Sequence, residues 1–184
     1  MKLIIIMRKF LISWSLKMYV LKKIIRGITL FKRNRITNEE LKENSAKIQD
    51  VLITQHHWKT AKSVNIYESI FKEVSTHELI HTANQSKEVY FPEENIDDNP
   101  PVDLIIVPGV VFDEKCGRCG RGSGYYDKYL SRIQDLNIPT IGLAHDLQIL
   151  PHDYELNNDT WDISLDMIIT EKRVITKEGY YNHD

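Results

Sequence analysis

The chain has 184 residues, of which 42% are hydrophobic, and its formal net charge is -2. This length suits one ordinary globular domain and is short for two, and the chain shows neither a low-complexity tract nor a disulfide scaffold. The charge is unevenly distributed, because residues 1–38 contain ten Lys or Arg and no Asp or Glu. The remainder is acidic on balance, which argues against a nucleic-acid-binding protein.

The first seventeen residues are apolar but interrupted by charge. Arg8 and Lys9 divide this stretch, so neither part approaches the roughly 20 apolar residues that span a bilayer. It lacks a small-residue secretory cleavage site, whereas scattered basic residues without acids suit an organellar presequence. We therefore place residues 1–17 outside the fold, as an upstream extension or a presequence. We expect a single domain over residues 18–184 and a cytoplasmic protein, or a mitochondrial one if residues 1–17 are a presequence.

From residue 19 the sequence predicts a helix. Leu21, Ile25 and Ile28 recur at helical spacing, so we expect them to form an apolar stripe that faces the core. Lys22 and Arg26 lie one turn apart beside this stripe. Basic residues at this spacing usually mark a solvated helix face.

Two further helices are predicted from their first residues. Thr37 and Glu40 have the spacing of a capping box, in which each side chain bonds the backbone N–H of the other residue. Ser75 and Glu78 have the same spacing, which predicts a second capped helix that extends to Ala83.

Four short apolar segments predict strands, at residues 64–67, 89–91, 104–107 and 139–144. Residues 104–107 are apolar without alternation, as expected of a strand that is covered on both faces. Because helices separate these strands, we expect a three-layer α/β domain with a mainly parallel central sheet and N-terminal helices.

Glycines and arginines alternate in the loop that follows residues 104–107. The glycines permit positive φ and let backbone N–H groups approach a ligand closely. Tyr126, Leu130 and Ile133 then fall at helical spacing, so a helix should begin near Gly124 and present its N-terminal amides to the loop. The loop fits neither a Walker A motif nor a dinucleotide fingerprint. It predicts a binding site for a multiply charged oxyanion, with a solvated surface loop as the alternative.

Cys116 and Cys119 form a lone C-x-x-C within this loop. A zinc site needs two more ligands at compatible spacing, and the chain has no second C-x-x-C. A redox pair is conceivable, although the surrounding pattern is not thioredoxin-like. We interpret both cysteines as ordinary loop residues.

The runs V-D-L-I-I-V-P-G-V-V-F-D and R-x-G-R-G-x-G-Y-Y-D-x-Y-L resemble the signature of the 5-formyltetrahydrofolate cyclo-ligases, also called 5,10-methenyltetrahydrofolate synthetases. The resemblance extends to K-x-x-I-R at Lys22, E-V-S-T at Glu73 and the run around Asp166. It is interrupted after Pro92, where relatives carry several tens of residues that include part of the folate pocket. We therefore expect a domain that is shortened after residue 92.

The resemblance implies ATP-dependent cyclisation of 5-formyltetrahydrofolate, possibly polyglutamylated, with Mg²⁺ and with release of ADP and phosphate. It implies an ATP site made of Lys22, Arg26, Arg118, Cys119, Gly120, Arg121, Gly122, Ser123, Gly124, Tyr125 and Tyr126. The folate residues that it implies are Glu73, Arg121, Gly122, Ser123, Gly124 and Tyr125. Asp127 and Asp166 match the family's metal positions. We assign stabilisation of the transferring phosphoryl group to Arg121 and contact with the formyl group to Tyr125.

Other functions remain open at this point. A family member that lost part of the folate pocket would be a non-catalytic nucleotide-binding protein. The basic residues 1–38 could serve a nucleic-acid-binding module, and the cysteines a redox protein. Under the cyclo-ligase hypothesis we expect a monomer with neither a nucleic-acid nor a membrane partner.

Overall fold

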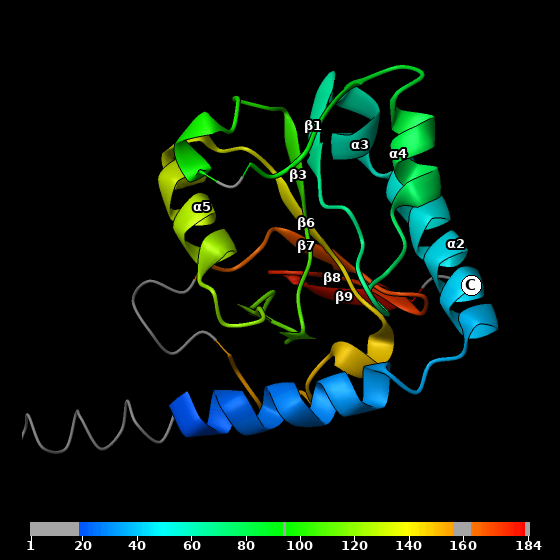
Figure 1. Ribbon diagram of the computed structural model, residues 1–184, viewed down its shortest axis with the longest axis vertical. Helices are drawn as coiled ribbons and strands as arrows, with labels where there is room; N and C mark the ends of the chain where they lie inside the picture. Colours follow the sequence, from blue (N-terminus) through cyan, green and yellow to red (C-terminus); the bar gives the residue numbers. More distant parts are fainter. Residues whose placement is uncertain (1–18, 94, 157–162, 183–184) are drawn as a thin grey trace, which may run out of the picture.

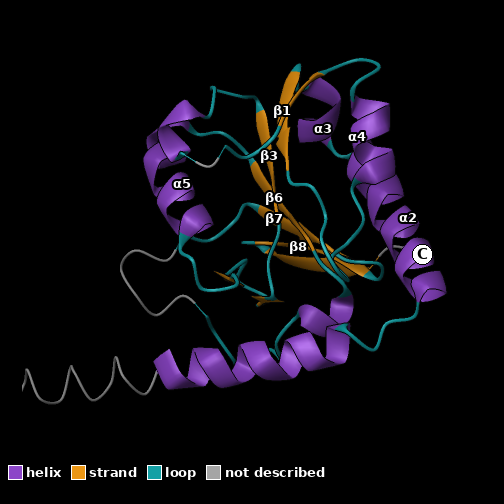
Figure 2. Ribbon diagram, in the orientation of Figure 1, coloured by secondary structure: helices purple, strands orange, loops and turns teal. Residues whose placement is uncertain are grey.

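The computed structural model describes residues 19–93, 95–156 and 163–182. A seven-stranded sheet forms its centre, with the strand order β2-β1-β3-β6-β7-β8-β9 (Figures 1 and 2). The first five strands in this order pair in parallel, and β8 and β9 add an antiparallel edge. The strands are β1 Ser63–Ile66, β2 Glu88–Tyr90, β3 Leu104–Val107, β6 Thr140–Leu143, β7 Met167–Ile169, β8 Arg173–Thr176 and β9 Gly179–Asn182.

Helices cover both faces of this sheet, as the sequence predicts (Figure 1). One face packs against three helices and the other against α5 and a two-stranded hairpin. The helices are α2 Asn38–Thr54, α3 His56–Thr60, α4 His77–Ala83 and α5 Tyr125–Ile133, and the hairpin strands are β4 Val111–Phe112 and β5 Arg118–Cys119. Short 3-10 turns lie at Ile96–Asp98 (η1), Gln134–Leu136 (η2) and Asp146–Gln148 (η3).

Strand β3 shows why its sequence has no alternation. Leu104 and Ile106 belong to the core beneath α2, α3 and α4, whereas Ile105 and Val107 belong to the core beneath α5. All four side chains are fully buried. A strand that is covered on both faces buries successive side chains in opposite layers, so every position is apolar.

One of the two predicted capping boxes is present. At the start of α2, Thr37 Oγ1 accepts a hydrogen bond from the N–H of Glu40 at 3.1 Å, and the Glu40 carboxylate accepts one from the N–H of Thr37 at 2.7 Å. The prediction for Ser75 was wrong, since α4 begins after Thr76 without a side-chain cap. The Thr76 hydroxyl donates instead to the carbonyl of Tyr67 at 2.8 Å, which ties the start of α4 to the end of β1.

The first helix covers residues 19–33 of the described chain and lies along one edge of the molecule (Figure 1). Its orientation differs from the prediction, because Leu21 and Ile28 are 39% and 52% exposed while Thr29 and Arg33 are buried. The inner face meets polar groups: the Arg33 guanidinium donates to the carbonyl of Gly109 at 3.3 Å. Ile25 and Leu30 also face inward, where they pack against an apolar cluster of Val110, Val111 and Leu156, so the inner face carries both polar and apolar side chains.

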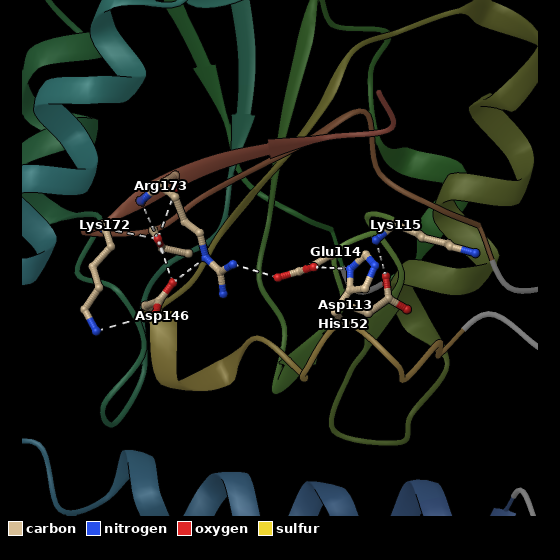
Figure 3. A network of polar contacts seen from close by, with 8 residues as sticks. Asp113, Glu114, Lys115, Asp146, His152, Lys172 and Arg173 are labelled. Atoms are coloured by element: carbon tan, nitrogen blue, oxygen red, sulfur yellow. Dashed lines mark hydrogen bonds and ion pairs between the residues drawn. The ribbon is translucent and has the colours of Figure 1, made fainter. Parts of the chain in front are cut away.

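A network of polar contacts holds the hairpin to the antiparallel edge of the sheet (Figure 3). Arg173 at the start of β8 pairs with Asp146 at 2.9 Å and with Glu114 of the hairpin at 2.7 Å. Glu114 also contacts His152. These links between segments far apart in sequence fix the loop that begins at the end of β3. Within the described parts of the chain, no helix combines the length and apolarity needed to cross a membrane.

Candidate functional site

A pocket of about 470 Å³ lies where the parallel strands β1, β2 and β3 end. Its wall includes Tyr67, Pro92 and Pro108, which follow these three strands closely, and the carboxyl edge of a parallel sheet is the usual ligand site of this architecture. Every ATP- and folate-binding residue predicted from the sequence lines the pocket. These residues are Lys22, Arg26, Glu73, Arg118, Cys119, Gly120, Arg121, Gly122, Ser123, Gly124, Tyr125 and Tyr126, and Asp127 joins them.

The glycine-rich loop adopts the backbone that its sequence predicts. Gly122 has φ of +106° and Gly124 has φ of +72°, and Gly124 caps α5 without a side-chain hydrogen bond. The guanidinium of Arg26 donates to the carbonyl of Arg121 at 3.5 Å. A Cβ atom at Gly122 would lie 2.7 Å from Arg26 Nη1, so the guanidinium can occupy this position beside the loop because residue 122 is glycine.

Arg118 does not point into open pocket space. Its side chain is 3% exposed, and Nη2 pairs with Asp127 Oδ1 at 2.5 Å. Nη1 donates to the carbonyl of Pro108 at 3.4 Å, and the guanidinium lies over the ring of Tyr126. Arg118 therefore braces the loop between the end of β3 and the first turn of α5, rather than standing as an unpaired phosphate ligand.

Arg121 and Glu73 contact each other. Arg121 Nη2 lies 3.0 Å from Glu73 Oε1, and Arg33 Nη2 lies 4.0 Å from the same oxygen. The second oxygen of Glu73 accepts a hydrogen bond from the N–H of Ile70 at 3.1 Å. Glu73 is buried while Arg121 is 41% exposed at its side chain, so the carboxylate orients a guanidinium that remains accessible to a ligand. Arg33 was not among the predicted site residues.

The two tyrosines of the loop have different surroundings. The Tyr125 hydroxyl donates to the carbonyl of Glu93 at 2.9 Å and accepts a hydrogen bond from Asn99 at 3.2 Å, so it contacts the short connection after Pro92. Tyr126 is largely buried, and burial raises the pKa of its hydroxyl. The Tyr126 hydroxyl has no hydrogen-bond partner among the described residues.

The two predicted metal ligands are separated. Asp127 lies in the first turn of α5, on the pocket, whereas Asp166 immediately precedes β7 and lines a different hollow with the last turn of α5. The Asp166 carboxylate accepts from the N–H and hydroxyl of Thr140 at 2.9 and 2.8 Å and pairs with Lys177 at 3.0 Å. Although burial opposes the shift, hydrogen bonds from Lys177 and Thr140 hold the pKa of Asp166 below its usual value.

The prediction that both carboxylates hold one metal ion therefore does not fit the structure. The physical reason is that Asp166 stands at the amino edge of the parallel sheet, beside the first residue of β6, and the pocket stands at the carboxyl edge. Within the described ranges, no group of three or more metal-binding side chains is present.

The cysteines have low reactivity in this environment. Burial raises the pKa of the Cys116 thiol to about 12, and Cys116 packs in the core beneath α5. Burial also raises the pKa of Cys119, which lies on the pocket wall. Thiols with raised pKa values are poor nucleophiles at neutral pH.

Several pocket residues were not among the predicted site residues. Tyr67, Glu68, Ile70, Phe91 and Pro92 lie outside the quoted motifs, whereas Pro108, Gly109 and Val110 belong to the run V-D-L-I-I-V-P-G-V-V-F-D. Most of them follow the predicted strands directly. The rule that ligands bind at the carboxyl ends of parallel strands could have found them, because the strands themselves were predicted.

Comparison with known proteins identifies the family of this chain. The model of the 5-formyltetrahydrofolate cyclo-ligase family matches residues 19–101 and 93–171. The probable 5-formyltetrahydrofolate cyclo-ligase of Schizosaccharomyces pombe is 30% identical over 198 aligned positions, which cover 84% of this chain and 97% of the relative. The chain belongs to the 5-formyltetrahydrofolate cyclo-ligase family. A second relative, the 5-formyltetrahydrofolate cyclo-ligase of Mycoplasma genitalium, is 29% identical over 80% of this chain and 96% of its own length.

Solved structures of cyclo-ligases share the fold. The 5,10-methenyltetrahydrofolate synthetase of Aquifex aeolicus superimposes with a TM-score of 0.72 at 28% identity, over 89% of this chain and 96% of that one. The synthetase of Mycoplasma pneumoniae gives a TM-score of 0.70 at 26% identity, over 82% of this chain and 99% of that one.

This cyclo-ligase chain lacks residues that its yeast relative has, because 198 aligned positions exceed its 184 residues. The two segments matched by the family model overlap at residues 93–101, which form the connection after Pro92.

Proposed function

We propose that this chain catalyses the ATP- and Mg²⁺-dependent closure of 5-formyltetrahydrofolate to 5,10-methenyltetrahydrofolate. The observation that carries the proposal is the meeting of three distant segments in one pocket: Lys22 and Arg26 from the first helix, Glu73 from the segment after β1, and Arg121 from the glycine-rich loop. Membership of the cyclo-ligase family supports it.

The pocket suits a polyphosphate. The N-cap of α5 is Gly124, which has no side chain to bond the helix, while the N–H of Tyr125 donates to the Ser123 hydroxyl at 3.4 Å. The N-terminus of α5 can therefore offer backbone N–H groups and a partial positive charge to an anion. Lys22 and Arg26 line the same wall, and glycines allow close approach of the backbone. These features together fit the triphosphate of ATP.

Asp127 is the carboxylate that we assign to Mg²⁺. Mg²⁺ is usually held by one or two carboxylates together with water and phosphate oxygens, so a single acid beside a triphosphate site suffices. Arg118 already fixes Asp127 Oδ1, and the side chain of Asp127 is 37% exposed. This geometry leaves the other carboxylate oxygen for an ion at the pocket wall.

The catalytic task is mainly positioning and charge stabilisation. When bound, ATP supplies the phosphoryl group that turns the N5-formyl oxygen into a leaving group while N10 closes the ring. Arg121, oriented by Glu73, stabilises the negative charge of the transferring group. Tyr125 places its hydroxyl near the formyl group, and Glu73 contributes to folate binding.

A second candidate is a nucleotide-binding protein without cyclo-ligase activity. The observation that favours it is the hydrogen bond from the Tyr125 hydroxyl to the carbonyl of Glu93, since this contact uses the proton that we assign to the formyl oxygen. Such a protein would bind Mg-ATP but would not release ADP in response to 5-formyltetrahydrofolate.

The test follows methenyltetrahydrofolate formation by ultraviolet absorbance with Mg-ATP and 5-formyltetrahydrofolate. We expect activity in the native chain and a loss of about 10²-fold or more in Arg121→Ala. Arg132→Ala is the control, because Arg132 lies on α5 outside the pocket and pairs with Asp97. Activity of Arg121→Ala within a few-fold of the native protein would refute its role. A folded chain that binds ATP but yields no product would favour the second candidate.

A further inference from the structure

The first helix has an apolar outer face that no described part of the chain covers. Val20, Ile24, Ile28 and Phe31 follow one another at spacings of four, four and three residues, so they form one stripe. Their exposed fractions are 46%, 54%, 52% and 64%. Figure 1 shows that the helix, in dark blue, runs along one edge of the molecule with the rest of the fold on one side only.

Basic side chains flank this outer stripe. Lys23, Lys32 and Arg35 are exposed, and the guanidinium of Arg35 lies 5.7 Å from the centre of the Phe31 ring. Residues 19–38 contain no acid, and neither do residues 1–18, whose sequence is also apolar and basic. A helix with a broad apolar face bordered by lysine and arginine has the composition of an interfacial helix, which lies in the plane of a lipid surface.

In place of the expectation of no membrane partner, we propose that the outer stripe of the first helix docks this protein on an anionic lipid bilayer. Val20, Ile24, Ile28 and Phe31 enter the boundary between headgroups and acyl chains, and Lys23, Lys32 and Arg35 contact the anionic headgroups. The helix lies on the membrane and does not span it.

A second copy of this chain fits the outer stripe less well. Pairing two such helices would bring Lys23, Lys32 and Arg35 of both copies together, and the helix has no acid to neutralise them. An anionic bilayer supplies that neutralisation along the whole length of the stripe. The basic residues beside the outer stripe therefore favour an anionic lipid surface over a second copy of this chain.

Docking leaves the pocket open to solutes. Lys22 and Arg26 project from the inner face of the same helix, so the bilayer and the pocket lie on opposite sides of it. Lipid binding and nucleotide binding are thus separable by mutation, and the docking proposal stands whether or not the cyclo-ligase activity is found.

The experiment is co-sedimentation of the full chain with vesicles of phosphatidylcholine and phosphatidylserine, compared with vesicles of phosphatidylcholine alone. We expect binding only to the anionic vesicles, weakened by salt and reduced about tenfold or more by the double substitution Ile24→Asp and Ile28→Asp. Lys23→Gln and Lys32→Gln should each weaken binding about fivefold. Leu136→Asp is the matched control, because Leu136 is 60% exposed in η2, away from the stripe, and it should bind like the native chain.

Three results would overturn the proposal. The first is an absence of binding to the anionic vesicles, or equal binding to both kinds. The second is unchanged binding of the Ile24 and Ile28 double variant, which would assign lipid contact to another segment. The third is a dimer in analytical ultracentrifugation that this variant abolishes, since the stripe would then be an interface between copies. Circular dichroism of each variant verifies that the fold is retained.

Discussion

Three glycines permit a graded test of how the first helix and the glycine-rich loop fit together. Gly122 has φ of +106°, and an added Cβ would lie 2.7 Å from Arg26 Nη1. Gly124 has φ of +72°, but an added Cβ would meet nothing within 4 Å. Gly27 lies within the first helix, where an added Cβ would also meet nothing within 4 Å. Substitution by alanine therefore separates backbone strain from contact with Arg26.

The expected changes in the free energy of unfolding follow from this geometry. Gly124→Ala should lower it by about 1–2 kcal/mol, the cost of an L side chain at positive φ. Gly122→Ala should lower it by about 1–3 kcal/mol, since its backbone is equally unfavourable and the tip of Arg26 can rotate away from the new methyl group. Gly27→Ala should raise it by about 0.5–1 kcal/mol, because alanine is the better helix former.

The contact at Gly122 should appear in nucleotide affinity. Displacing Arg26 removes its hydrogen bond to the carbonyl of Arg121 and moves a guanidinium from the pocket wall. We assign this guanidinium to the phosphates of ATP, and a hydrogen bond between charged groups contributes about 1.5–3 kcal/mol, so Gly122→Ala should weaken ATP binding about tenfold or more. Gly27→Ala, one residue from Arg26 but on the exposed side of the helix, should bind ATP like the native protein.

Urea unfolding and isothermal titration calorimetry measure the two effects. The double variant Gly122→Ala with Arg26→Met tests whether the loss of ATP affinity arises from displacement of Arg26, because the effects of two substitutions that act through one contact are not additive. A folded Gly122→Ala protein that binds ATP with native affinity would refute the argument, and so would full additivity with Arg26→Met.

Two other predictions concern buried ionisable groups. Arg118→Met should lower the free energy of unfolding by about 1–3 kcal/mol in urea, since it removes the buried partner of Asp127, whereas Lys115→Met removes an exposed pair with Glu155 and should cost under about 1 kcal/mol. Equal losses would contradict the bracing role of Arg118. Burial lowers the pKa of His145 from 6.5 to about 4, so the unfolded chain binds more protons between these values. The contribution of neutral His145 to the free energy of unfolding should therefore be fully present above pH 6.5. It should fall by about 3 kcal/mol as the pH approaches 4. His145→Phe should flatten this slope, and an unchanged slope would exclude His145 as its source.

Local sequence signals predicted the parts of the fold that depend on neighbouring residues. The uninterrupted apolar run of β3, the capping box at Thr37 and the start of α5 after Gly124 are each determined within a few residues. The same signals predict where most of the pocket residues lie, because a loop that follows a parallel strand must lie at the carboxyl edge of the sheet.

Long-range arrangement decided what the sequence could not predict. The period of the first helix identifies an apolar stripe, but it does not say whether the core or the solvent lies beside it, and here Arg33 and Thr29 are the buried residues. Asp166 precedes a strand, whereas Asp127 follows a loop at the opposite edge of the sheet. The family motifs match both residues and therefore do not reveal that the two carboxylates are separated. Thr76, rather than the predicted Ser75, is the N-cap of α4, and its hydroxyl donates to the carbonyl of Tyr67 instead of bonding the helix.

The short connection after Pro92 bears directly on the choice between the two proposed functions, because it reaches the site. Asn99 accepts a hydrogen bond from the N–H of Glu93 at 3.1 Å and donates one to the Tyr125 hydroxyl at 3.2 Å, while that hydroxyl donates to the carbonyl of Glu93. Exchanging one such hydrogen bond for another to a formyl oxygen has a net free energy of only about 1 kcal/mol. The contact therefore orients Tyr125 without closing the pocket to a folate. The volume of the pocket, about 470 Å³, lies within the usual range for small-molecule sites. The residues just before this connection, Phe91 and Pro92, also line the pocket, where they offer apolar surface to a folate.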